Sequence, residues 1–286
     1  MVSGVMGGKR GLVMGVANDH SIAWGIAKRL AEHGAELAFT YQTPQLGKRV
    51  RPLAKSLGSD FVLPCDVGVA PDADDPMSLD AMFAALAERW PTIDFLVHAI
   101  AFSDKHELRG RYADTSRANF ATTMLVSCFS FTEVAQRAAR LMTNGGAMVT
   151  LTFGGSTRVM PNYNVMGVAK AALEASVRYL AVDFGPSAIR VNAISAGPVR
   201  TLAGAGISDA RIMFNHQKHN APLRRNVGIE EIGNTAAYLL SDLSSAVTGE
   251  VHFVDSGYNI VAMPRLDELK ATDTGENGDT PAQAAE

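Results

Sequence analysis

The chain of 286 residues has few of the features that mark disulfide-bonded, membrane-spanning or nucleic-acid-binding proteins. Its two cysteines, Cys65 and Cys128, lie in apolar segments and cannot build a disulfide framework or a metal site. No stretch approaches the ~18 uninterrupted apolar residues of a membrane-spanning helix, and the run after Lys9 and Arg10 is too short for a signal peptide. The net charge of −3 gives no sign of nucleic-acid binding. We therefore expect a cytoplasmic protein with two buried, reduced thiols, and with no metal, membrane or nucleic-acid partner.

Apolar runs of strand length alternate along the chain with segments of helical periodicity. Near-continuous apolar strands of this kind are typical of a parallel sheet that helices cover on both faces. Right-handed crossovers then predict a single doubly wound, Rossmann-type α/β domain with a seven-stranded parallel sheet, and with ligands at the carboxyl ends of the strands. The expected strands cover 10–16, 36–41, 60–66, 93–100, 146–152, 189–195 and 250–255, and the expected helices cover 21–33, 44–57, 77–90, 115–141, 162–184, 207–219 and 229–242.

The hydrophobic pattern ends close to residue 265. The segment from Pro264 onwards carries six acidic residues and two basic ones, and it is enriched in Thr, Gly and Asp. We expect one domain over 1–265 and an acidic tail over 266–286, with the last ~15 residues disordered.

The turn after the first expected strand, GVANDHSIAWGIA (15–27), has features of a dinucleotide-binding turn but lacks the G-x-G-x-x-G pattern. Gly15 allows a tight turn, Ser21 is a good N-cap, and the helix N-terminus from Ile22 suits a pyrophosphate. An ordinary strand–turn–helix with a serine cap would look the same, so the turn alone leaves both interpretations open.

Further candidates lie at the ends of the second and third expected strands. Gln42 stands where a dinucleotide-binding fold often has an acid, and its amide can still bond the ribose or the adenine. The nearest cations along the chain are Lys48 and Arg49, so a 2′-phosphate lacks an obvious partner and NADH is favoured over NADPH. Asp66 could accept a hydrogen bond from the adenine and Val67 could flank the ring, although Asp66 could equally be a cap or turn residue.

The stretch PNYNVMGVAK (161–170) contains Tyr163 and Lys170 in an expected helix. A step of seven residues leaves two side chains about 20° apart around the helix axis and about 10 Å apart along it. Short-chain dehydrogenases carry a catalytic Tyr/Lys pair four residues apart, and here that position is Gly167. The pair is therefore the same catalytic pair with altered spacing, the mark of a different reaction, or a coincidence on a helix.

Several segments together resemble bacterial enoyl-(acyl-carrier-protein) reductases, a divergent branch of the short-chain dehydrogenase/reductase family with Tyr-x6-Lys spacing. The resemblance covers about residues 7–265 and implies that this domain is an NAD-binding reductase domain that assembles into a homotetramer. The segments are GVANDHSIAWGIA, AELAFTYQ, CDV, PNYNVMGVAKAALEASVRYLA, RVNAISAGPVRTLA and GEVHFVDSGY.

The resemblance implies NADH-dependent reduction of the 2,3 double bond of trans-2-enoyl thioesters on acyl carrier protein, in fatty-acid elongation. Tyr163 would donate to the enolate oxygen and Lys170 would bond the nicotinamide ribose. Two alternatives remain: an ordinary short-chain carbonyl or alcohol oxidoreductase, against which Gly167 argues, and a non-catalytic NAD-binding regulator.

The same resemblance implies which residues surround the cofactor and the acyl chain, in addition to the candidates named above. The segment HAIAF (98–102) would line the nicotinamide and substrate, and 202–219 would be a mobile flap. Plain core packing is the alternative for Met166 and Met213. The cofactor-binding residues would be Gly15, Ser21, Ile22, Gln42, Asp66, Val67, Ile100, Lys170, Val199, Arg200, Thr201, Leu202 and Ala203, and the substrate-binding residues Ala101, Phe102, Ser103, Phe153, Tyr163, Met166, Ile207 and Met213.

Three features depart from the commonest bacterial pattern. Phe153 replaces a second active-site tyrosine. Ala101 replaces a glycine beside the nicotinamide, and its added methyl implies weaker binding of flat diphenyl-ether inhibitors such as triclosan. The flap has Ser208, Arg211 and Ile212 where relatives carry a basic cluster, which weakens the expectation of carrier-protein recognition.

Overall fold

A computed structural model of the chain describes residues 4–71, 74–199, 201 and 210–267. Its centre is a seven-stranded sheet in which every neighbouring pair of strands is parallel. The strands are β1 (Arg10–Met14), β2 (Glu36–Tyr41), β3 (Val62–Pro64), β4 (Phe95–His98), β5 (Gly146–Thr152), β6 (Ile189–Ala196) and β7 (Val251–Val254).

The strand order is β3-β2-β1-β4-β5-β6-β7, so the chain builds one half of the sheet outward from β1 and then crosses back to build the other half. β1 and β4 therefore lie side by side, with Met14 opposite His98, and the loops that follow them diverge. A crevice forms at such a point, beyond the carboxyl ends of the strands. The predicted doubly wound, seven-stranded parallel sheet is confirmed.

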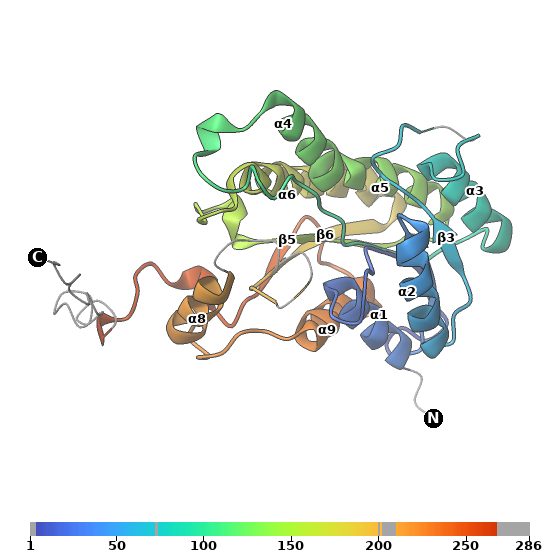
Figure 1. The fold of residues 1–286 in the computed structure, drawn as a ribbon. Coiled ribbons are helices and arrows are strands. Elements are labelled where there is room, and N and C mark those ends of the chain that lie inside the picture. Colours follow the sequence, from blue (N-terminus) through green and yellow to red (C-terminus); the bar gives the residue numbers. More distant parts are fainter. Residues whose placement is uncertain (1–3, 72–73, 200, 202–209, 268–286) are drawn as a thin grey trace, which may run out of the picture.

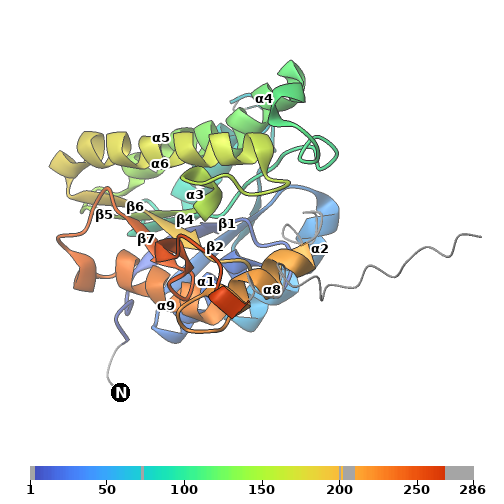
Figure 2. The same ribbon diagram turned by 90° about the vertical axis from the view of Figure 1, so that its left-hand side faces the viewer.

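Helices cover both faces of the sheet, as Figures 1 and 2 show. The helices are α1 (Ile22–Glu32), α2 (Pro44–Ser56), α3 (Leu79–Arg89), α4 (Arg117–Met124), α5 (Ser130–Leu141), α6 (Asn164–Phe184), α8 (Ala210–Asn220) and α9 (Ile229–Leu240). Short 3-10 turns occur at Tyr112–Asp114, Gly154–Ser156, Gly185–Ser187, Asp242–Ser244 and Tyr258–Ile260. One layer contains α3, α5 and α6, and the opposite layer contains α1, α2 and α9.

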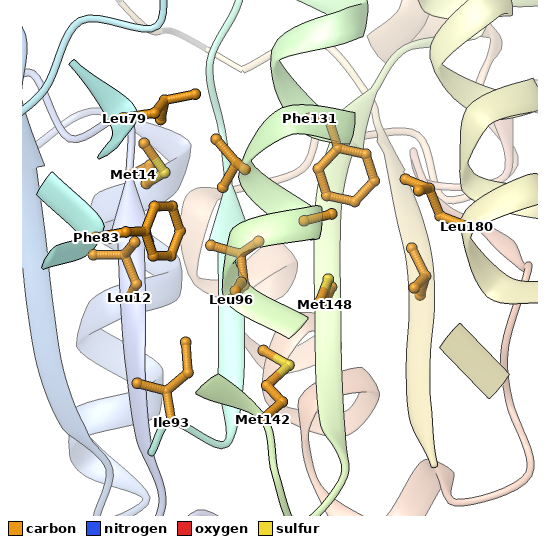
Figure 3. Close-up of a cluster of buried hydrophobic side chains, with 14 of the residues drawn as sticks. Leu12, Met14, Leu79, Phe83, Ile93, Leu96, Phe131, Met142, Met148 and Leu180 are labelled. Atoms are coloured by element: carbon orange, nitrogen blue, oxygen red, sulfur yellow. The ribbon is translucent and has the colours of Figure 1, made fainter. Parts of the chain in front are cut away.

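Two hydrophobic cores lie on the two sides of the sheet, which explains why its strands are apolar without alternation. The consecutive β4 residues Phe95 and Leu96 point to opposite faces, and both are fully buried. Figure 3 shows the core under α5 and α6, where Phe131 and Leu180 lie over the sheet beside Leu96 and Met148. Each such side chain contributes about 1.5–3 kcal/mol when fully buried.

The structure differs from the expected helices in two places that matter for the site. The expected helix 115–141 is interrupted by a π-helix, Leu125–Phe129, between α4 and α5. The expected helix 162–184 begins at Asn164, so Tyr163 occupies the N-cap position and not the helix itself. Asn162 and Asn164 both have positive φ angles, 59° and 33°, and asparagine tolerates that conformation better than most residues. The prediction that Tyr163 and Lys170 share one helical face is wrong in this respect, because the turn, and not the helix, sets the direction of Tyr163.

Both cysteines are buried and free, as expected. Within the described part of the chain, no helix combines the length and apolar character needed to cross a membrane. The segment beyond residue 267, which includes nearly all of the expected acidic tail, lies outside the described residues.

Candidate active site

A cavity of about 580 Å³ opens at the carboxyl ends of the strands. This volume is within the range of small-molecule and cofactor sites. Arg200, Leu202, Ala203 and Ile207 lie outside the described residues. All the other predicted site residues line the cavity: Gly15, Ser21, Ile22, Gln42, Asp66, Val67, Ile100, Ala101, Phe102, Ser103, Phe153, Tyr163, Met166, Lys170, Val199, Thr201 and Met213.

The turn between β1 and α1 forms one end of this cavity. Gly15 has a φ of 102°, and a Cβ atom there would overlap the carbonyl oxygen of Ala99. Ser21 occupies the N-cap position, but its hydroxyl accepts the N–H groups of Ala17 at 3.0 Å and Asn18 at 3.1 Å. The serine therefore braces the turn and does not cap the helix with its side chain. The N–H groups at the start of α1, beside the cavity-lining Ile22, lie at the positive end of the helix dipole, so the turn suits an anion.

The ends of β2 and β3 meet through a side-chain hydrogen bond. The Gln42 amide donates to Asp66 Oδ2 at 3.0 Å, and Asp66 Oδ1 accepts the N–H of Gly68 at 2.8 Å. Asp66 is thus a turn residue that also lines the cavity, and its bond to the adenine stays a prediction. The sequence did not point to Arg51, whose guanidinium lies 5.2 Å from the centroid of the cavity-lining Tyr41 ring.

The aromatic residues Phe153 and Tyr163 form the wall at the other end. Their ring centroids are 5.2 Å apart and their planes make an angle of 69°. Gly155 leaves room for the phenol, because a Cβ atom there would overlap the Tyr163 ring. Burial, and then the charge of Glu174, raise the pKa of the Tyr163 hydroxyl, so it stays protonated and can donate a hydrogen bond.

Lys170 reaches the same region from the second turn of α6. Its side chain is buried, and its Nζ donates to the carbonyl oxygen of Leu151 at 2.8 Å. Burial lowers the pKa of Lys170 to about 8, although Cys128 and Glu174 oppose that shift. The ammonium group is therefore mostly protonated at neutral pH.

Gly167 occupies the position where ordinary short-chain dehydrogenases carry their lysine. A Cβ atom at Gly167 would lie 2.7 Å from the carbonyl oxygen of Gly155, which is closer than real Cβ contacts come. A lysine four residues after Tyr163 would therefore require the backbone at Gly155 to move. This contact argues against an ordinary short-chain carbonyl reductase.

His98, the first residue of HAIAF, does not line the cavity. It is fully buried, with Nδ1 3.1 Å from Thr150 Oγ1 and Nε2 3.0 Å from Ser130 Oγ. Burial lowers the pKa of His98 to about 3, so the ring is neutral and has a place in the core. The expectation that HAIAF lines the site is wrong for His98, whereas Ile100, Ala101 and Phe102 do line it.

Several cavity residues were missed by sequence reasoning. Val126 lies in the π-helix and lines the cavity, and helical periodicity gives no signal for a π-helix. Phe214 follows Met213 and could have been found from its place in the expected flap helix. Among the described residues, no cluster of three or more His, Cys, Asp or Glu side chains could hold a metal ion. The missed residues include Lys105, Leu108, Val126, Leu151, Thr152 and Phe214.

Comparisons with known proteins agree on one group of enzymes. Residues 15–259 match the family described as enoyl-(acyl carrier protein) reductase. Enoyl-(acyl-carrier-protein) reductase (NADH) 2 of Rhizobium meliloti (strain 1021) is 68% identical over 95% of this chain and 99% of its own length. The crystal structure of FabI from Candidatus Liberibacter asiaticus has 62% identity and a TM-score of 0.88, and covers 92% of this chain and 99% of that one. The reductase of Anaplasma phagocytophilum, solved in complex with NAD, has 56% identity and a TM-score of 0.87, with coverage of 93% and 99%.

Proposed function

Because the chain belongs to the enoyl-(acyl carrier protein) reductase family, we propose that it uses NADH to reduce the 2,3 double bond of trans-2-enoyl thioesters on acyl carrier protein, in fatty-acid elongation. One observation carries this proposal beyond the family match. The buried Tyr163 and Lys170 line the same cavity as the β1–α1 turn, and the alternative lysine position is closed at Gly167.

The described residues fit a nicotinamide dinucleotide. Gln42 and Asp66 would hold the adenosine, the N-terminus of α1 would hold the pyrophosphate, and Lys170 would bond the nicotinamide ribose. Val199 and Thr201 would bond the carboxamide. When bound, NADH supplies the hydride that adds to C3 of the enoyl chain.

Tyr163 supplies the group that the substrate needs during this reduction. Negative charge develops on the thioester oxygen, and a pre-placed donor stabilises it. The raised pKa of the Tyr163 phenol keeps its proton in place as a donor, and Lys170 adds positive charge nearby. Phe153 presents an apolar ring beside the phenol, and Met166 and Met213 add apolar surface for the acyl chain. C2 of the enolate then takes a proton from water.

One assay separates this function from its alternatives. NADH oxidation is followed first with a 2-enoyl thioester and then with a 3-keto thioester. Turnover of the enoyl substrate alone supports the proposal, turnover of the keto substrate alone indicates an ordinary carbonyl reductase, and NADH binding without turnover of either indicates a regulator.

The carrier protein would approach over α8. Met213 and Phe214 of this helix line the cavity, and Arg211 is exposed on the same helix. Acyl carrier protein is acidic, so this cation is its candidate contact. The variant Arg211→Glu should lose activity on carrier-linked substrates and keep activity on simple thioesters. We also propose a homotetramer and a cytoplasmic location.

A further inference from the structure

Three buried polar side chains form a line along α4 and the π-helix. Asn119, Thr123 and Ser127 are four residues apart, and their relative exposures are 7%, 0% and 0%. All three form hydrogen bonds with the loop 102–104, which follows β4 and contributes Phe102 and Ser103 to the cavity wall. We call these three side chains the polar ladder.

Ser127 binds the backbone of Phe102 twice. Its hydroxyl oxygen accepts the Phe102 N–H at 2.9 Å, and the hydroxyl donates to the Phe102 carbonyl oxygen at 2.9 Å. Ser127 lies within the π-helix, where the wider turn alters which side chains face the loop. One hydroxyl thus pairs both polar backbone groups of a residue that is itself 54% exposed.

The other two members hold the next residues of the loop. Asn119 Oδ1 accepts the N–H of Asp104 at 3.0 Å and the hydroxyl of Ser103 at 3.3 Å. The Thr123 hydroxyl lies 2.9 Å from Ser103 Oγ and 3.2 Å from Asn119 Oδ1. The Ser103 hydroxyl is therefore hydrogen-bonded to two side chains of α4.

We propose that the polar ladder is a positioning element that sets the wall of the substrate pocket by holding loop 102–104 against α4. Ser103 acts through this bond to the helix, and its hydroxyl does not bind the substrate. This inference rests on the proposed function, because the ladder positions the wall beside the thioester. Displacing such a wall by about 1 Å can reduce the rate by roughly 10²-fold.

The variant Ser127→Ala tests the proposal, with Ser130→Ala as its matched control. Ser130 is also fully buried, and its hydroxyl bonds Val126 O at 2.8 Å and His98 Nε2 at 3.0 Å, away from the loop. Each variant removes one buried hydroxyl from the same helical segment. We expect Ser127→Ala to raise KM for the enoyl thioester about tenfold, since two backbone groups lose their partner. The Kd of NADH should stay within about twofold in both variants, because other loops hold the adenosine, and Ser130→Ala should lower the Tm without raising KM.

Two outcomes would overturn the proposal: a KM for Ser127→Ala within about twofold of the wild type, or an equal rise in KM for Ser130→Ala. If Ser127→Ala does not fold, Thr123→Val and Ser103→Ala replace it, because each removes the same hydrogen bond with little change in volume. Their effects on KM should then be non-additive in the double variant, and additive effects would contradict the ladder. If the wild type does not turn over enoyl thioesters at all, the proposed function has failed. The Kd of an enoyl thioester for the NAD-loaded protein, measured by titration, then tests the ladder separately.

Discussion

At position 163 the chain holds a buried phenol whose pKa is raised by burial and by Glu174. Tyr163→Phe removes this donor and keeps the ring, so kcat should fall by about 10²–10³ while NADH binding is retained. Stopped-flow or steady-state NADH oxidation measures the loss. Tyr238→Phe is the matched control, because Tyr238 is on α9, is 37% exposed and does not line the cavity, and it should leave kcat unchanged. A Tyr163→Phe enzyme with wild-type kcat would show that the oxyanion donor lies elsewhere.

If the reaction needs the charge on Lys170, its rate should fall at high pH. Its pKa is lowered by burial to about 8, so the protonated form predominates below that pH and is lost above it. If the ammonium group is needed, kcat/KM should decline as the pH rises through about 8. The raised pKa of Tyr163 places the ionisation of its phenol above this pH range, so that ionisation does not cause the decline near pH 8. A flat profile between roughly pH 7 and pH 9.5 would rule out a required proton on Lys170.

Individual site residues were predictable where the sequence pattern itself placed them. Gln42 and Asp66 each follow a strand, and parallel strands bring their ends together at one edge, so their meeting follows from topology. The role of Ser21 was not predictable in detail, since a serine before a helix can cap it or bond back into the turn. His98 shows the opposite failure, because the resemblance placed the whole of HAIAF at the site and the structure buries His98 in the core.

Among the elements, the junction of β5 and α6 shows what periodicity cannot provide. The apolar pattern placed the helix correctly to within two residues, but those residues decide the direction of the Tyr163 side chain. Two left-handed asparagines and the close approach of Gly155 determine the turn, and such contacts are visible only in three dimensions. The π-helix between α4 and α5 was equally invisible, because a segment of five residues is too short to show a period of its own in the apolar pattern.

The close packing of α6 on the loop after β5 can be tested at Gly167. In Gly167→Ala the new methyl would lie 2.7 Å from Gly155 O, so unfolding free energy should fall by about 1–3 kcal/mol. Gly185→Ala is the control at the C-cap of the same helix, where φ is −53° and no described atom lies within 4 Å of the added Cβ. There the substitution should leave stability the same or raise it by about 0.4–1 kcal/mol. Urea denaturation of both variants measures the difference in stability. Equal stabilities would mean that the backbone at Gly155 can move to accept the methyl group at no cost in free energy.

For the whole molecule, the alternation of strands and helices was enough to predict the doubly wound sheet, because parallel strands need covering helices and right-handed crossovers. The sequence also bounded the site, since the described residues it nominated for the cofactor and the substrate line one cavity, with the exception of His98. What it could not supply are features that depend on several segments at once: the pocket wall built by the polar ladder, and any surface used for assembly.

The outer surface of α4, α5 and α6 is the candidate assembly surface. These helices lie together on one side of the sheet in Figures 1 and 2. The π-helix between α4 and α5 exposes Phe129 by 51%, and α6 exposes Tyr179 by 75% and Val182 by 76%. Exposed apolar side chains gathered on one layer are typical of an interface between chains. A closed tetramer would bury such a face symmetrically, in keeping with the proposed homotetramer.

Val182→Glu should break this assembly, because a charge without a partner would be buried at the contact. Size-exclusion chromatography with light scattering should give four chains of 30.4 kDa for the wild type and a smaller species for the variant. Leu243→Glu is the control, since Leu243 is 66% exposed in the turn that packs with α9, in the opposite layer. It should leave the mass unchanged. A monomeric wild type would refute the tetramer, and a tetrameric Val182→Glu protein would move the interface away from α6.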